Sequence, residues 1–295
     1  MDALIIKTGQ NLLLPFYHVV SDNNPKHVKH LYTPRSIHNF KKDLDFLLEH
    51  FKSISLDHLL SFKKDGIPSH KRYFHLTFDD GMSEFYTIVA PILREKGVHA
   101  TVFLNSNFID NKELFYRFKA SILYDKLKDN KLLKVSYQAK EQLNELANKH
   151  GINFDQYLQQ QQPYLTSAQI KELQEQGFTF GAHSKNHPLY KDIELDAQVI
   201  QTKDSIASIT KAFNLDYAVF SFPFTDDGVK LAFFDAINSD VDFTFGCAGL
   251  KEDNAPNHFQ RIGMEANKSG KEIIKSEYLY YLMKEKVGKH KIMRR

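Results

Sequence analysis

Short apolar runs alternate with amphipathic helical patterns along most of this 295-residue chain. The clearest unit is a strand candidate at residues 73–78, a helix that begins at Ser83 and ends at Gly97, and a second strand at residues 99–104. Repeated strand and helix units of this kind form parallel sheets, because the helix carries the chain back to start the next strand in the same direction. We therefore expect an α/β protein with a parallel sheet, either open or closed into a barrel.

The remaining predicted elements extend the same alternation. The other strand candidates are short and apolar, and they lie at residues 12–19, 52–55, 178–182, 218–222, 242–245 and 260–264. Helices are expected after Thr33 and Pro34, after a capping box from Thr166 to Gln169, at residues 196–213 and 229–238, and from Ser269 onward. Together these elements predict a single domain that spans residues 1–295.

One segment interrupts the alternation. Residues 108–163 are rich in Lys, Gln, Asn and Glu with helical spacing, and no strand pattern occurs among them. We predict a helical insertion within the domain. Two interpretations stay open: a solvated cap on the rim of the sheet, or a lid that narrows access to a site.

The charge balance argues against a nucleic-acid partner. The chain has 39 Lys and Arg against 36 Asp and Glu, a net charge of only +3. Basic residues gather only late in the sequence, at Lys284, Lys286, Lys289, Lys291, Arg294 and Arg295. We interpret this stretch as a solvated terminus, with peripheral contact to acidic lipid as the alternative.

Cys247 is the single cysteine, so the chain forms no intramolecular disulfide and no cysteine-rich metal cluster. Residues 1–10 lack the pattern of a secretory signal, and no segment approaches the roughly 20 apolar residues of a membrane span. A reducing cytoplasm is the expected location.

Two adjacent carboxylates follow the strand at residues 73–78 directly. Asp79 and Asp80 precede Gly81 and stand at the carboxyl end of that strand, where α/β enzymes hold their ligands. Adjacent carboxylates are costly unless a cation shares them. The simpler interpretation is a turn, which Asp and Gly both favour.

A pair of histidines follows the next predicted strand in the same way. His183 and His187 are four residues apart after residues 178–182. Two neutral imidazoles and one carboxylate bind zinc and leave a fourth position open. In a chain with 14 His such a pair also arises by coincidence. Together the two strand ends nevertheless supply the ligands and the spare carboxylate of a metal-dependent hydrolase.

Three motifs in this order resemble those of the polysaccharide deacetylase family, also called NodB-homology or carbohydrate esterase family 4 enzymes. The motifs are Thr77-Phe78-Asp79-Asp80-Gly81, His183-Ser184-Lys185-Asn186-His187-Pro188 and Phe220-Ser221-Phe222-Pro223-Phe224. The resemblance implies a distorted (β/α)7-type barrel and metal-dependent removal of acetyl groups from N-acetylated or O-acetylated sugars.

The resemblance also implies a role for each matching residue. Asp80, His183 and His187 match the ligands of one divalent ion, with zinc expected and cobalt or another divalent ion as the alternative. Asp79 matches the general base. The backbone N–H of Phe224 resembles an oxyanion donor, in a loop that Pro223 fixes.

The chain departs from the family pattern at two points. Ser221 stands where many members have an Arg that contacts the catalytic Asp, and we predict that Arg261 supplies this charge instead. The alternative for Arg261 is a surface ion pair. The usual late motif with a catalytic His is not evident, but Tyr17-His18 resembles an early Tyr-His of the biofilm poly-N-acetylglucosamine deacetylases. We therefore predict His18 as the general acid, with His258 as second candidate and plain loop histidines as the alternative.

The expected function is removal of acetyl groups from an N-acetylated glycan or its biosynthetic precursor, by hydrolysis of a C–N bond outside peptides. A second hypothesis is a sugar-binding or assembly protein that keeps the metal site with weak catalysis, motivated by Ser221. A third is an amidase of the same fold that acts on a C–N bond outside sugars.

Overall fold

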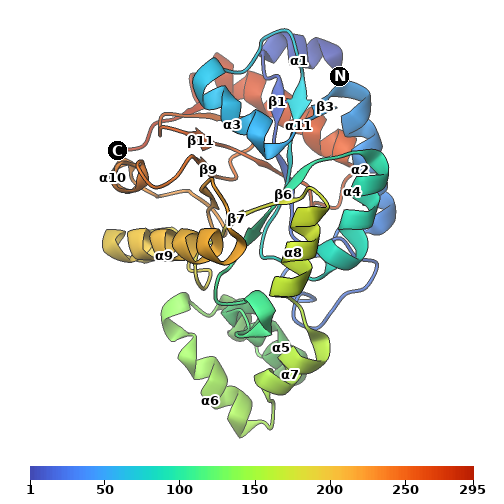
Figure 1. Ribbon diagram of the computed structural model, residues 1–295. Helices are drawn as coiled ribbons and strands as arrows, with labels where there is room; N and C mark the ends of the chain where they lie inside the picture. The colour runs from blue at the N-terminus through green and yellow to red at the C-terminus, as the bar shows by residue number, and fades with distance from the viewer.

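An eight-stranded sheet is the centre of the computed structural model, which describes residues 1–295 (Figure 1). Every pair of neighbouring strands in this sheet is parallel. In spatial order the strands are β11 (His258–Phe259), β9 (Phe243–Phe245), β8 (Val219–Ser221), β7 (Thr179–Ala182), β6 (Ala100–Leu104), β5 (Leu76–Phe78), β2 (Pro15–Tyr17) and β12 (Ile262–Gly263). The expected α/β class with a parallel sheet is confirmed.

The two edges of the sheet belong to one short stretch of chain. Strands β11 and β12 lie at opposite edges, yet both fall within residues 258–263, which we call the closing segment. Phe259 pairs with Phe245 of β9, and Ile262 pairs with Pro15 of β2. The sheet therefore curls on itself, as expected for a distorted barrel.

Two predicted strands are each broken by one residue. The strand predicted at residues 12–19 consists of β1 (Leu12–Leu13) and β2, and the strand predicted at residues 73–78 consists of β4 (Tyr73–Phe74) and β5. Strands β1 and β4 join β3 (Lys52–Ser53) in a separate three-stranded parallel sheet. His75 lies at the second break, fully buried, between the carbonyl oxygen of Ile54 and the hydroxyl of Thr101, each 2.7 Å from a ring nitrogen.

Helices surround the barrel. They are α1 (Asp2–Thr8), α2 (Ile37–His50), α3 (Leu56–Asp65), α4 (Ala90–Lys96), α8 (Ser167–Glu175), α9 (Leu195–Phe213), α10 (Leu231–Ile237) and α11 (Gly270–Lys286), with a π-helical turn at Phe85–Val89. The predicted capping box begins α8, and the structure has a second one, from Ser269 to Glu272, at the start of α11. Helix α2 starts three residues later than predicted, because Ser36 rather than Thr33 accepts the capping hydrogen bond, from the N–H of Asn39. None of the helices has both the length and the hydropathy that a membrane crossing requires.

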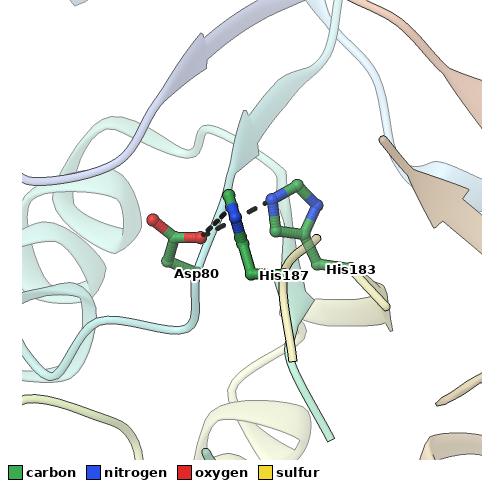
Figure 2. Close-up of side chains that lie close together, drawn as sticks. All are labelled: Asp80, His183 and His187. Atoms are coloured by element: carbon green, nitrogen blue, oxygen red, sulfur yellow. Dashed lines mark ion pairs between the residues drawn. The ribbon is translucent and has the colours of Figure 1, made fainter. Parts of the chain in front are cut away.

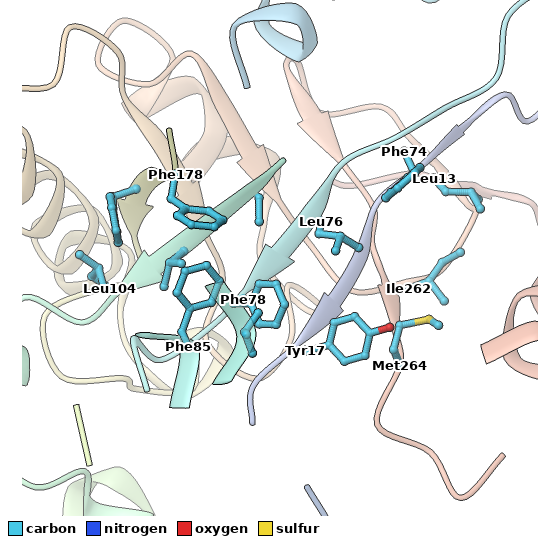
Figure 3. Close-up of a cluster of buried hydrophobic side chains, with 14 of the residues drawn as sticks. Leu13, Tyr17, Phe74, Leu76, Phe78, Phe85, Leu104, Phe178, Ile262 and Met264 are labelled. Atoms are coloured by element: carbon cyan, nitrogen blue, oxygen red, sulfur yellow. The ribbon is translucent and has the colours of Figure 1, made fainter. Parts of the chain in front are cut away.

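Apolar side chains of neighbouring strands fill the space between the sheet and its helices (Figure 3). The rings of Tyr17 on β2 and Phe78 on β5 stack at 5.5 Å, and Phe40 of α2 packs edge-on against Tyr17 at 5.2 Å. The hydroxyl of Tyr17 donates to Asp43 of α2, so this buried polar group has a partner. Burial on both faces explains the continuous apolar character of the predicted strands.

Residues 108–163 form a helical group beyond the carboxyl ends of the strands (Figure 1). The group contains α5 (Tyr116–Leu127), α6 (Glu141–Lys149) and α7 (Phe154–Gln161), with 3-10 turns at Ile109–Asn111, Leu132–Lys134 and Tyr137–Ala139; a further 3-10 turn, Tyr190–Asp192, precedes α9. Its apolar side chains, among them Phe118, Leu143 and Leu158, pack in a hydrophobic cluster separate from the main core. The cluster also includes Val19, Val28 and Met82, so the insertion packs against segments that follow β2 and β5.

The basic stretch at the C-terminal end is not a free tail. Strand β13 (Lys291–Ile292) pairs with β10 (Glu252–Asp253), and Arg294 is 8% exposed. The interpretation of this stretch as a solvated terminus is wrong for Arg294, which buried carboxylates hold. The backbone of Lys291 and Ile292 is paired, while the Lys291 side chain stays exposed. Arg294 is thus not available to an acidic lipid.

Gly181 on β7 offers a test of the packing inside the barrel. A Cβ atom at this position would lie 2.6 Å from Val219 Cγ2 and 2.7 Å from Phe103 Cε1. We expect Gly181→Ala to lower the free energy of unfolding by about 1–3 kcal/mol, measured by chemical denaturation. Gly263→Ala, where the nearest atom is 3.3 Å away, is the matched control and should cost less. Equal losses would contradict this account of the packing.

Candidate active site

The predicted site residues follow strands whose carboxyl ends meet at one edge of the barrel. Asp79 and Asp80 come after β5, His183 comes after β7 and His18 comes after β2. Parallel strands place all these positions on the same side of the sheet. The structure thereby brings together residues that are up to 165 positions apart in the sequence.

Asp80, His183 and His187 converge on a common point (Figure 2). Asp80 Oδ1 lies 3.1 Å from His187 Nε2 and 3.5 Å from His183 Nε2, and all three residues are buried. His183 Nδ1 lies 2.8 Å from the carbonyl oxygen of Ser221, which fixes the proton there and leaves Nε2 as a free acceptor.

Two buried atoms at this point, Asp80 Oδ1 and His183 Nε2, have no hydrogen-bond partner in the protein. Buried polar atoms normally have partners, so these atoms are aimed at something that the chain itself does not supply. One carboxylate and two imidazoles suit zinc and similar divalent ions. The residues present therefore fit a metal centre.

The protonation states fit the same interpretation. Burial lowers the pKa of His183 to about 4, so its imidazole is neutral at pH 7. Burial alone would raise the pKa of Asp80, but the neighbouring His187 outweighs it and holds that pKa well below its usual range. Both groups therefore offer lone pairs at neutral pH.

The site loops hold unusual backbone conformations. Asp80, Ser184, His187 and Phe224 all have positive φ, between 57° and 71°, a region that residues other than glycine rarely adopt. Hydrogen bonds offset part of the cost: the N–H of His187 donates to Ser184 Oγ at 3.0 Å, and Asn105, after β6, donates to the carbonyl oxygen of His183.

Arg261 reaches Asp79 from the middle of the closing segment. Its Nη1 donates to Asp79 Oδ1 at 2.8 Å and its Nη2 donates to Oδ2 at 2.7 Å, a bidentate pair. Asp79 is 2% exposed and Arg261 is 1% exposed, so Arg261 is not part of a surface ion pair. Burial would raise the pKa of Asp79, but Arg261 outweighs it and holds the pKa below its usual value.

Ser221 shows how this chain departs from the family pattern. Its hydroxyl accepts a 2.6 Å hydrogen bond from Arg261 Nη2 and lies 3.5 Å from Asp79 Oδ2. A larger side chain at position 221 would meet the guanidinium. The guanidinium that pairs with Asp79 therefore comes from the closing segment. Strand β8 contributes only the small hydroxyl of Ser221 beside it.

His18 is paired with a carboxylate that the sequence analysis missed. Its Nδ1 lies 2.6 Å from Glu265 Oε2, while Glu265 Oε1 accepts from the backbone N–H groups of His18 and Val19 at 2.8 and 2.7 Å. Burial alone would lower the pKa of His18, but Glu265 outweighs it and raises the pKa to about 9. The sequence signal that could have identified Glu265 is its position directly after the predicted strand at residues 260–264.

His258, the second candidate for the acid, lies in a different group. Its side chain is fully buried, with Nδ1 2.7 Å from Thr244 Oγ1 and Nε2 3.2 Å from Asp226 Oδ2. Both ring nitrogens are therefore engaged away from the candidate metal ligands. The geometry favours His18 over His258 as a proton donor.

Phe224 and the insertion both contact a candidate metal ligand. The ring centroid of His187 lies 4.5 Å from that of Phe224 and 4.4 Å from that of Phe115, which precedes α5. The backbone N–H of Phe224 donates no hydrogen bond within the protein. Pro223, directly before it, accepts from the N–H of Thr225 at 2.7 Å, in a tight turn. The insertion thus forms one wall of the site.

Tyr32 and Glu265, which both contact His18, line a polar cavity of about 650 Å³. Its volume is in the range of small-molecule pockets. The lining comes from the starts of α2 and α11 and includes Tyr32, Ser36, Asn39, Glu265, Asn267 and Ser269. The ring of Tyr32 lies 5.3 Å from that of His18, and its buried hydroxyl has no partner.

The fold and the site define a class: a parallel α/β barrel with a candidate metal centre at the carboxyl ends of its strands. Solved structures share this fold. The Streptococcus pyogenes deacetylase PplD in complex with acetate matches with a TM-score of 0.62 and 18% identity over 90% of this chain and 97% of its own. IcaB from Ammonifex degensii matches with a TM-score of 0.61 and 13% identity over 91% and 97%.

The sequence comparison gives the family. The polysaccharide deacetylase profile matches residues 66–232, more than half of the chain, so the protein belongs to the polysaccharide deacetylase family. A de-N-acetylase from Aggregatibacter actinomycetemcomitans also shares the fold, with a TM-score of 0.60 and 15% identity over 89% and 99% of the two chains. No curated protein sequence gives a significant match.

The buried ion pair between Arg261 and Asp79 leads to a testable prediction. Arg261→Met leaves the Asp79 carboxylate buried without its partner, and we expect the free energy of unfolding at pH 7 to fall by about 3–5 kcal/mol. Without Arg261, burial raises the pKa of Asp79 above its unfolded value, so the penalty shrinks as the pH falls and the carboxylate takes up a proton. Denaturation curves at pH 7 and pH 4.5 measure both effects. Arg94→Met, at an exposed position of α4, is the control, and a loss independent of pH would argue against this electrostatic cause.

Proposed function

We propose that the protein is a metal-dependent N-deacetylase that acts on an N-acetylated glycan or a precursor of one. The observation that carries this proposal is the set of unpartnered ligand atoms on Asp80 and His183, directly beside the buried carboxylate of Asp79. Family membership and the shared fold support the reaction class. A metal-dependent hydrolase that uses a separate general base needs a metal centre and a carboxylate outside the metal's ligands, and this arrangement offers both.

Asp80, His183 and His187 are the proposed ligands of one divalent ion, with zinc as our expectation. Such an ion supplies Lewis acidity: it polarises the acetyl carbonyl and lowers the pKa of water. Asp79, which Arg261 keeps ionised, accepts the proton of the attacking water. The free N–H of Phe224 donates a hydrogen bond to the negative charge that develops on the carbonyl oxygen.

His18 is the proposed general acid. Its pKa of about 9 keeps the imidazole protonated at neutral pH, so it can give a proton to the leaving amine as the C–N bond breaks. The cavity beside His18 is the proposed place for the sugar that carries this amine, because its lining is rich in hydroxyl and amide groups. The cytoplasmic location and an intracellular glycan precursor as substrate stay predictions.

Ser221 was the main argument for a binding protein without efficient catalysis. Arg261 contacts Asp79 in spite of that departure, so the base has its charged partner and the argument loses its force. An amidase that acts outside sugars uses the same residues, and substrate profiling with N-acetylated sugars and simple N-acetyl amines separates the two.

The proposal predicts that two site variants separate metal binding from turnover. Asp79→Asn should keep its metal and lose most activity, because the amide cannot accept the proton of water, whereas His183→Ala should lose both. Acetate release from an acetate ester and from N-acetylglucosamine oligomers, with metal content measured beside it, tests this. His58→Ala, on the exposed face of α3, is the control. Full activity of Asp79→Asn would overturn the assignment of the base.

The proposed acid predicts the alkaline side of the pH–rate profile. Because His18 must be protonated to act, the wild-type rate should fall as the pH rises through about 9. Glu265→Gln removes the charge that raises this pKa, so the fall should move to lower pH. His18→Gln should lose roughly 10²–10⁴ in rate together with that limb. Glu285→Gln, an exposed position of α11, is the control, and an unchanged limb in His18→Gln would reassign the acid.

A further inference from the structure

A second buried cluster of charged groups lies outside the proposed site. Asp226, Asp253 and His258 bring their polar atoms within 4.8 Å of one another, a set that could hold a cation. The protein fills this role itself, because Arg294 donates to both carboxylates. Its Nη2 lies 2.7 Å from Asp253 Oδ2 and also contacts Asp226, and its Nε lies 2.9 Å from Asp253 Oδ1.

Asp226 is the centre of this cluster. Its Oδ1 accepts from the backbone N–H of Cys247 at 3.0 Å, and its Oδ2 accepts from Gln260 Nε2 at 2.7 Å. Arg294 Nη1 also donates to the carbonyl oxygens of Asp226 and Val229, at 2.8 and 3.0 Å. Asp226 does not cap a helix, because Lys230 is the residue before α10. Instead, its hydrogen bond to Cys247 connects the segments that follow β8 and β9.

This cluster touches the proposed site on two sides. Asp226 stands two residues after Phe224, whose φ of 59° and free N–H belong to the proposed oxyanion turn. Gln260 is the neighbour of Arg261 in the closing segment. Side chains of successive residues in extended chain point to opposite faces, so Gln260 meets the cluster while Arg261 meets Asp79.

The surroundings of Gly246 show how tightly these groups are packed. A Cβ atom there would lie 2.5 Å from Asp226 Cγ and 2.5 Å from Gln260 Oε1. Its carbonyl oxygen accepts from Arg261 Nε at 3.1 Å. The cluster and the guanidinium that holds the base are thus separated by one glycine backbone.

We propose that Arg294 is a positioning residue: through Asp226 it holds the turn that carries the Phe224 N–H and the closing segment that carries Arg261. The inference rests on the proposed function, since it assigns the turn to that reaction. Without Arg294, two buried carboxylates would face each other with no guanidinium between them, and we expect them to move apart although Gln260 still donates to both. Misplacement of a reacting or stabilising group by about 1 Å costs about 10²-fold in rate.

The first arm of the experiment measures kinetics. Arg294→Ala should lower kcat about 10²-fold with KM and metal content nearly unchanged. Arg294→Lys keeps the charge without the planar set of donors and should lie between the alanine variant and wild type. Arg295→Ala, the exposed neighbour, is the control. If Arg294→Ala folds poorly, Asp253→Asn removes one of the two partners of Arg294 and should lower kcat in the same direction.

The second arm uses Cys247 and needs no activity. This single cysteine has its N–H on Asp226 and its Sγ 3.4 Å from the carbonyl oxygen of Phe224, so its thiol reports on the turn. Release of Asp226 should raise the rate of reaction with a disulfide reagent at least several-fold in Arg294→Ala, measured well below its melting temperature. Arg295→Ala should react like wild type.

The two arms separate the possible failures. A purely structural Arg294 would lower the melting temperature and leave kcat and the thiol rate of the folded protein unchanged, which overturns the inference. A wild type without metal-dependent deacetylation overturns the proposed function. In that case a faster thiol reaction in Arg294→Ala still supports the proposal that Arg294 positions the turn. An unchanged thiol rate refutes that proposal.

Discussion

The bidentate contact between Arg261 and Asp79 links the closure of the barrel to the charge of the proposed base. Arg261 belongs to the closing segment, which pairs with β9 at one edge of the sheet and with β2 at the other. Its guanidinium also contacts Thr77 on β5 and Ser221 on β8. One buried cation therefore neutralises the proposed base and holds three parts of the barrel in register.

Backbone strain and buried polar atoms without partners, both rare in protein cores, occur close to this ion pair. Asp80, His187 and Phe224 hold left-handed backbone, and buried polar atoms on Asp80 and His183 have no partner. Strain and unsatisfied atoms lower stability, and natural proteins keep them where function requires them. The rest of the barrel, with its continuous apolar strands, offsets this cost.

Much of the architecture follows from local patterns. The alternation of strands and helices predicted the parallel sheet, and the capping box at Thr166 predicted the start of α8. The strand-end positions of Asp80, His183 and His187 were enough to predict their convergence, because parallel strands end at the same edge. The interpretation of Arg261 as partner of Asp79 relied on a gap in the family pattern rather than on periodicity.

What the sequence could not reveal depends on contacts between distant residues. Glu265 lies 247 positions from His18, and no local pattern links the two. Arg294 was one of the late basic residues that the sequence predicted to be solvated, whereas the pairing of β13 and the loop after β8 bury it. Sequence patterns report which face of an element is buried, but not which buried charges meet.

The closing segment also constrains how the molecule folds. Its pairing with β2 joins residues 247 positions apart, and the contact between Arg261 and Asp79 joins residues 182 positions apart. Contacts of such high sequence separation are slow to form, because a long loop must close first. Until then the proposed base lacks its cation and the sheet has two unpaired edges, which expose the chain to association with other copies. A molecule whose closing segment has not docked therefore lacks both the closed sheet and the charged partner of the proposed base.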